Sequence, residues 1–232
     1  MIALARVILI GIFILFSSIV ISLLCLLRPK NPKNTYIAAL MYGKVAYFLG
    51  FKVSLAGNEN LPKTNAIFVC NHQSNYDVFI ATNTVIENTV SVGKKSILYF
   101  PFFGLMYWLS GNILIDRSDK NKAINSLTIA QRNIKSKNLS LWFFPEGTRN
   151  YAKQLYPFKS GAFHLAYNTG VPIVPVCISL YYNKLSLNRI NNGKIIIKYL
   201  PPVYVNKSAK ESAKEVHLSM KENILDLEMK QN

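Results

Sequence analysis

Short apolar runs alternate with longer, more polar segments through residues 51–199. The runs are rich in Val, Ile, Leu and Phe, which is typical of strands covered on both faces of a parallel sheet. Most intervening segments are long enough for crossover helices, so we expect an α/β fold with a mostly parallel sheet of about seven strands flanked by helices. The expected strands are residues 51–55, 66–70, 90–93, 113–115, 139–144, 174–179 and 195–199, and residues 207–230 are expected to form a closing amphipathic helix.

A longer apolar segment lies at the amino end. Residues 7–27 contain no charged side chain, with Arg6 before them and Arg28, Lys30 and Lys33 after them. This length is enough to cross a bilayer core of ~30 Å, and no small-x-small site typical of a cleaved signal peptide follows before Arg28. The basic residues after the segment predict that its carboxyl end, and the chain beyond it, lies on the cytoplasmic side of the membrane.

The next apolar segment predicts a second helix close to the membrane. Residues 35–51 are apolar and aromatic, interrupted by Lys44, which favours a helix lying in the interface. We therefore expect residues 1–52 to form a membrane-anchoring element of two helices, followed by a globular domain at residues 53–232. Two arrangements of the first helix remain open: it either spans the bilayer or embeds in a single leaflet.

Composition limits the class of partner. The chain has 232 residues, enough for one core of ordinary size, and a formal net charge of +16. Such a charge predicts an anionic partner, and nucleic acid is the usual first candidate. The sequence has no RNA-binding aromatic signature and no basic helix with heptads, and its three cysteines lack metal-ligand spacing. Because the amino end is apolar, we expect anionic membrane lipids as a partner, no nucleic acid and no metal.

Candidate chemistry begins where the expected strand at residues 66–70 ends. His72 follows in a loop, and Ser74 with Asp77 has the spacing of a capping box, which places Asp77 in the first turn of a helix. The carboxylate can then accept from one ring nitrogen and leave the other as a proton acceptor. His72 is therefore a candidate general base with Asp77 as its orienting partner. The alternative is a loop histidine bonded to its own helix cap.

A second set of polar residues follows the expected strand at residues 139–144. Open α/β sheets bind ligands at the carboxyl ends of their strands, and Glu146, Gly147, Thr148 and Arg149 lie at such an end. Gly147 permits close backbone approach, and the planar fork of Arg149 suits a phosphate. Glu146 is expected to steer Arg149 or to accept from a substrate hydroxyl. The alternative is an ordinary polar turn with a surface salt bridge.

Two further segments offer positive charge. Residues 111–117 form a short apolar strand that ends in Asp116 and Arg117, and Arg117 is a candidate to contact the same phosphate from a second side. Taken alone, this segment favours an ion pair at a strand end. Lys159 precedes an expected helix whose N-terminus also favours an anion.

Together these segments resemble an established set of sequence blocks. Their order and spacing are similar to the glycerolipid acyltransferase family, and within it to bacterial enzymes that acylate lysophosphatidic acid to phosphatidic acid. The resemblance covers about residues 50–205 and includes residues 93–104. The four blocks are His72 with Asp77, residues 111–117, residues 144–149 and residues 171–176.

The resemblance implies roles for individual residues. His72 would be the general base and Asp77 its orienting partner, and Arg117, Glu146 and Arg149 would bind the acceptor. Gly147 and Thr148 belong to the same block, and we infer that Lys95 and Lys159 are oxyanion or phosphate partners. The resemblance also implies a two-helix membrane element and, with the cytoplasmic orientation above, a catalytic domain at residues 53–232 on the cytoplasmic side of a bacterial inner membrane.

The expected reaction is direct acyl transfer from an acyl thioester to the sn-2 hydroxyl of 1-acyl-glycerol 3-phosphate, without a metal or organic cofactor. Acyl-carrier protein and coenzyme A thioesters both remain open as donors. Two other functions also remain open. One is acylation of glycerol 3-phosphate or another lysophospholipid. The other is non-catalytic binding of anionic lipid by a membrane-anchored protein, which would not need His72.

Overall fold

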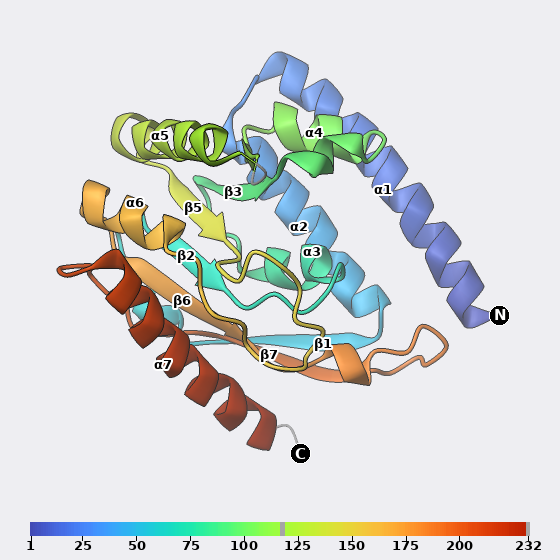
Figure 1. Ribbon diagram of the computed structural model, residues 1–232. Coiled ribbons are helices and arrows are strands. Elements are labelled where there is room, and N and C mark those ends of the chain that lie inside the picture. The colour runs from blue at the N-terminus through green and yellow to red at the C-terminus, as the bar shows by residue number, and fades with distance from the viewer. Residues whose placement is uncertain (117–118, 231–232) are drawn as a thin grey trace.

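Seven strands form one sheet in this computed structural model, which describes residues 1–116 and 119–230 (Figure 1). Their order across the sheet is β1-β7-β6-β2-β5-β3-β4. Neighbouring strands run parallel, except for the antiparallel pair β6 and β7. The strands are β1 (Phe51–Ala56), β2 (Ile67–Cys70), β3 (Thr89–Lys94), β4 (Ile113–Ile115), β5 (Ser140–Phe143), β6 (Ile173–Ile178) and β7 (Gly193–Tyr199).

The sheet confirms the expected mostly parallel α/β fold, because each strand lies within two residues of the bounds that the apolar runs predict. The reason is visible in β2, where side chains alternate between the two faces of the sheet. Ile67 and Val69 belong to one buried cluster, and Phe68 and Cys70 belong to the other. Both faces are covered, so every position of such a strand is apolar.

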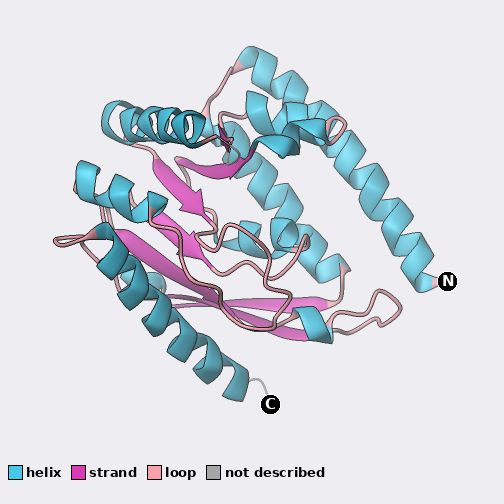
Figure 2. Ribbon diagram, in the orientation of Figure 1, coloured by secondary structure: helices cyan, strands magenta, loops and turns pink. Residues whose placement is uncertain are grey.

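Helices cover both faces of the sheet (Figure 2). On one face α5 (Lys120–Lys137), α6 (Gly161–Thr169) and α7 (Ala209–Met229) share a core with the strands. On the other face the core includes residues of α1 (Ile2–Leu27), α2 (Pro32–Phe48), α3 (Asp77–Ile80) and α4 (Phe103–Leu109). The expected closing helix is therefore present as α7.

The second helix packs on the sheet. Asn31 caps α2 by accepting a hydrogen bond from Lys33 N at 3.0 Å, and Pro32 lies at its first position. Tyr42, Val45 and Ala46 of α2 are buried in the same cluster as the strands. The two expected N-terminal helices thus exist, and α2 shares a core with the sheet. A separate membrane element at residues 1–52 stays a prediction.

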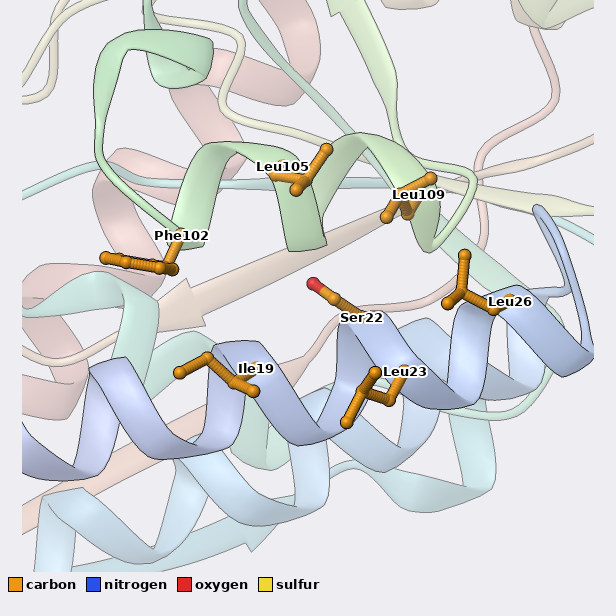
Figure 3. A pocket seen from close by; sticks show the side chains of 7 residues that line it. All are labelled: Ile19, Ser22, Leu23, Leu26, Phe102, Leu105 and Leu109. Carbon is orange, nitrogen blue, oxygen red and sulfur yellow. The ribbon is translucent and has the colours of Figure 1, made fainter.

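The first helix is mostly exposed and apolar, yet both ends of it are held. Within the described residues it is the one helix long and apolar enough to cross a membrane by length and composition. Near its start, Arg6 is buried and its guanidinium donates to the carbonyls of Leu187, at 3.0 Å, and Arg189. Just beyond its end, Lys30 N donates to Leu109 O of α4 at 3.1 Å. Between these contacts, α1 and the α4 region line an open apolar pocket of about 270 Å³ (Figure 3).

Candidate active site

The candidate residues come together at one edge of the sheet. Strands β2, β3, β4, β5 and β6 are linked by parallel pairing, so their carboxyl ends lie at the same edge. The loops that follow these ends carry His72, Lys95, Asp116, Glu146 and Tyr181. This is the edge at which open α/β sheets bind ligands.

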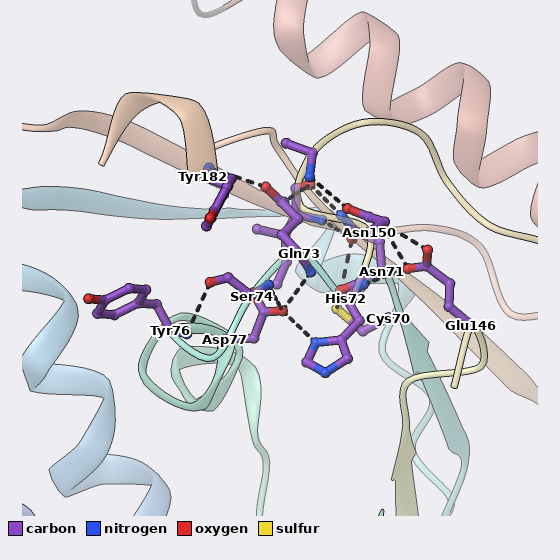
Figure 4. Close-up of polar contacts among 12 residues, drawn as sticks. Cys70, Asn71, His72, Gln73, Ser74, Tyr76, Asp77, Glu146, Asn150 and Tyr182 are labelled. Atoms are coloured by element: carbon purple, nitrogen blue, oxygen red, sulfur yellow. Dashed lines mark hydrogen bonds and ion pairs between the residues drawn. The ribbon is translucent and has the colours of Figure 1, made fainter. Parts of the chain in front are cut away.

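His72 and Asp77 form the pair that the sequence predicts (Figure 4). The distance from Nδ1 of His72 to Oδ2 of Asp77 is 2.6 Å. Asp77 starts α3 and is 1% exposed, whereas the His72 side chain keeps 20% of its surface. The imidazole also stacks on the ring of Phe144, with 4.2 Å between the ring centres. The second ring nitrogen points away from these contacts (Figure 4).

The carboxylate of Asp77 accepts from several further donors. Its Oδ2 atom accepts from the backbone N–H groups of Gln73 at 2.7 Å and Ser74 at 3.0 Å. The bond from Ser74 N to Asp77 is one of the two hydrogen bonds expected in a capping box. The second differs from the prediction, because the hydroxyl of Ser74 accepts from Tyr76 N instead. These bonds fix the carboxylate before any substrate arrives.

Tyr181 completes the shell around Asp77, and sequence reasoning missed it. Its phenol is 0% exposed and donates to Oδ1 of Asp77. A phenol has one proton, so the 2.9 Å contact between Tyr181 and Ser74 must use the serine hydroxyl as donor. Burial, followed by the nearby charge of Asp77, raises the pKa of Tyr181 well above its usual value, which keeps the phenol protonated as a donor.

Two amide side chains clamp the His72 loop to the segment that follows β6. Asn71 donates to Ile178 O at 2.9 Å and accepts from Ile178 N at 2.8 Å. Gln73 donates to Ser179 O at 2.9 Å and accepts from Tyr181 N at 3.0 Å. The residues on both sides of His72 are therefore fixed to the neighbouring strand, and Tyr181 is positioned by the same clamp.

Glu146 holds the His72 loop from the other side. Its Oε1 atom accepts from His72 N at 2.7 Å, and its Oε2 atom accepts from Tyr156 N at 2.9 Å. Asn150 Nδ2 donates to both oxygens, and Asn150 N donates to His72 O at 2.8 Å. Burial raises the pKa of Glu146, and the hydrogen bonds oppose that shift. In this structure the carboxylate orders the backbone of His72, a role that the sequence did not indicate.

The turn after Glu146 faces solvent and carries the expected phosphate-binding groups. Gly147 adopts φ +74°, a conformation that favours glycine, while Thr148 and Arg149 are exposed. The side chain of Lys159 lies against this glycine, because a Cβ added at Gly147 would come 2.8 Å from its Cε atom. Lys159 N also donates to Pro145 O at 2.8 Å. The turn and Lys159 therefore form one cationic patch.

Lys95 lies toward the far end of the sheet. Lys95 Nζ is 3.5 Å from the carboxylate of Asp116, which places it where β3 and β4 end. Arg117 itself falls outside the described residues, and its proposed phosphate contact stays a prediction. No group of three or more His, Cys, Asp or Glu side chains suited to a metal occurs among the residues that the structure describes.

A thiol nucleophile does not fit this site. Cys70 precedes the His72 loop, but it is 0% exposed and donates weakly toward Asn71 O. Burial, with a further contribution from Asp77, raises the pKa of its thiol well above the usual range. The thiolate that would attack a substrate is therefore disfavoured.

Comparisons with known proteins agree with this geometry. The acyltransferase family model matches residues 52–179. A 1-acyl-sn-glycerol-3-phosphate acyltransferase of Salmonella typhimurium is 47% identical, over 84% of this chain and 80% of its own length. The Haemophilus influenzae protein of the same name is 40% identical over 98% of this chain and 97% of its own. The crystal structure of a 1-acyl-sn-glycerophosphate acyltransferase from Thermotoga maritima superposes with a TM-score of 0.78 and 26% identity, covering 97% of this chain and 94% of that one. The chain belongs to the acyltransferase family.

Proposed function

We propose that this chain transfers an acyl group from an acyl thioester to the sn-2 hydroxyl of 1-acyl-sn-glycerol 3-phosphate. The observation that carries the proposal is the hydrogen bond between His72 and Asp77, at the edge that also carries the Arg149 turn. The second ring nitrogen has no hydrogen bond to any residue that the structure describes (Figure 4). The names of the relatives support the choice of acceptor. The product would be phosphatidic acid.

The proton path follows from the tautomer that Asp77 imposes. The Asp77 carboxylate can only accept, so Nδ1 of His72 carries the proton and Nε2 has a free lone pair. Nε2 removes the proton of the acceptor hydroxyl as its oxygen attacks the thioester carbonyl. The carbon–sulfur bond then breaks, and the thiolate takes the proton from the imidazolium. No nucleophile from the chain is needed.

The acceptor phosphate would bind at the exposed turn. Arg149 offers a bidentate fork, Lys159 adds a second cation beside Gly147, and Thr148 adds a hydroxyl. Arg117 stays a predicted second contact to the same phosphate. Anchoring the phosphate positions the sn-2 hydroxyl, and such positioning accounts for a large part of many enzymatic rate enhancements.

Fewer residues are assigned to the acyl donor than to the acceptor. Lys95 or backbone N–H groups would stabilise the oxyanion of the tetrahedral intermediate. Lys95 must then exchange its 3.5 Å contact with Asp116 for the substrate. Both acyl-carrier protein and coenzyme A thioesters suit this scheme, and anionic membrane lipids would hold the positively charged chain at its substrate.

The position of α1 supports attachment to one leaflet. A helix standing perpendicular through a bilayer would carry Arg6 to the opposite face, whereas Arg6 is bound to carbonyls at residues 187 and 189 of the globular part. We infer that α1 lies along the protein with its apolar side in the membrane, on the cytoplasmic side of a bacterial inner membrane.

Replacing the base should abolish the reaction. His72→Ala should lower kcat at least about 10²-fold because no other base is positioned at the hydroxyl. Asp77→Asn should lower it strongly as well, since the amide would favour the wrong tautomer. An acyl-transfer assay on purified protein, with several lyso acceptors and both donor types, measures this. The control His164→Ala, at an exposed histidine of α6, should keep full activity. Near-normal transfer by His72→Ala would contradict the role of His72 as the base, and an absence of transfer by the intact chain would leave lipid binding without chemistry as the better account.

Replacing the guanidinium of the turn should weaken acceptor binding alone. Arg149→Lys keeps the charge but loses the bidentate fork, so the KM for the acceptor should rise about tenfold while the KM for the donor stays unchanged. The matched control is Arg132→Lys at an exposed position of α5. A raised KM for the donor with a normal KM for the acceptor would reverse the assignment of this patch.

Removing the Tyr181 phenol should change the pH dependence of the reaction. Without its donor on Oδ1, the Asp77 carboxylate holds the imidazolium proton more strongly, so Tyr181→Phe should move the acidic limb of the kcat/KM profile to higher pH. The kcat should fall about tenfold, in line with loss of a hydrogen bond to a charged group. Tyr182→Phe, at the exposed neighbour, is the control. A uniform loss of activity with an unmoved limb would mean that Tyr181 only packs.

A further inference from the structure

An apolar ridge projects from the catalytic edge of the sheet. It consists of the 3-10 turn η3 (Lys95–Tyr99), residues 100–102 and α4, which together connect β3 to β4. Six of its large side chains are exposed, with exposed fractions from 40% for Leu98 to 82% for Tyr99. Soluble surfaces rarely gather so many large apolar groups in one short segment. The ridge residues are Leu98, Tyr99, Phe100, Phe102, Leu105 and Trp108.

The ridge is continuous with the exposed side of α1. Phe102 and Leu105 line the pocket between α4 and α1, and both are more than half exposed. On the opposite wall, Leu23 and Leu26 of α1 are also more than half exposed (Figure 3). Because side chains of both elements line this pocket and are still more than half exposed, the two elements adjoin and form one apolar surface.

The local backbone holds the ridge outward. Phe102 precedes α4 at φ +60°, an unusual conformation for a bulky residue, and its ring remains 53% exposed. Behind it, Gly104 is buried, and a Cβ there would come 2.4 Å from Ile97 O. This close packing of the turn on α4 leaves the aromatic side chains on the outside.

Basic groups border the apolar surface. Lys30 Nζ lies 4.9 Å from the centre of the Trp108 ring, and Lys30 lies in the short link between α1 and α2. Lys94 and Lys95 are exposed where the ridge begins. Tryptophan, tyrosine and lysine side chains placed around an apolar surface are typical of proteins at a membrane interface.

We propose that the ridge at residues 98–108 is a second membrane-inserting element, which enters the same leaflet as the apolar side of α1. This deepens the proposed function, on which it rests, because the ridge leaves the sheet at the edge that carries His72 and so brings the site to the bilayer surface. The net charge of +16 and the basic border favour an anionic leaflet over a second copy of this equally basic chain.

Two tryptophans make the proposal directly measurable. Trp108 on the ridge is 43% exposed, and Trp142 in the core is 4% exposed. The intact chain would be reconstituted into vesicles of phosphatidylglycerol and phosphatidylethanolamine with brominated acyl chains. Trp108 should then lose most of its emission, whereas Trp108→Phe should leave the remaining Trp142 emission unquenched. This readout needs no turnover, so it is independent of the proposed reaction.

A double variant tests the contribution of the ridge. Tyr99→Ser with Phe100→Ser should reduce the quenching of Trp108 and raise the KM for vesicle-borne acceptor about tenfold, the order expected when exposed aromatic side chains lose a lipid contact. Transfer to detergent-dispersed acceptor should stay within about twofold of the intact chain. The matched control is Tyr167→Ser with Tyr204→Ser, at positions 58% and 60% exposed on other elements.

Two results would overturn the proposal. Trp108 emission that is untouched by brominated lipid and still quenched by aqueous iodide would show that α1 inserts without the ridge. Trp108 shielded from both quenchers, together with dimers in solution, would show that a second copy covers this surface.

Discussion

The site depends on one buried carboxylate. Asp77 accepts from the imidazole of His72, from two backbone N–H groups and from the phenol of Tyr181. A buried charge is costly unless it is well hydrogen-bonded, and here every bond also positions a neighbour. The bonds from Gln73 N and Ser74 N hold the His72 loop, and the phenol of Tyr181 ties the segment after β6 to it. The bond to His72 sets the tautomer of the imidazole. The hydrogen bonds that satisfy the buried charge of Asp77 are therefore the same bonds that set the geometry of the proposed active site.

Parallel strands bring distant residues to that carboxylate. The loop after β2 is held to the segment after β6 by Asn71 and Gln73, and to the turn after β5 by Glu146. Because the strands end at one edge, each loop needs few residues to reach its neighbour. The exposed Arg149 turn is built on the same support, so the proposed base and the proposed phosphate patch are positioned together.

The sequence predicts the parts of this structure that depend on local pattern. Each buried strand is an apolar run, and the capping box places Asp77 beside His72. Tyr181 could not be predicted because it lies 104 residues from Asp77 and resembles any core tyrosine after a strand. Glu146 was expected near substrate, but its internal bonds to residues 72, 150 and 156 depend on how three loops fold. The ridge was missed because an apolar run has the same pattern whether it is buried or exposed.

The central claim is that Asp77 holds His72 with its proton on Nδ1 and its Nε2 lone pair free. Nitrogen-15 spectra of histidine-labelled protein test this directly, and His72→Gln would identify the His72 signals among the three histidines. At neutral pH the account predicts a protonated Nδ1 with a directly coupled hydrogen and an unprotonated Nε2. A protonated Nε2 with a bare Nδ1, or the averaged signals of a freely exchanging imidazole, would contradict it.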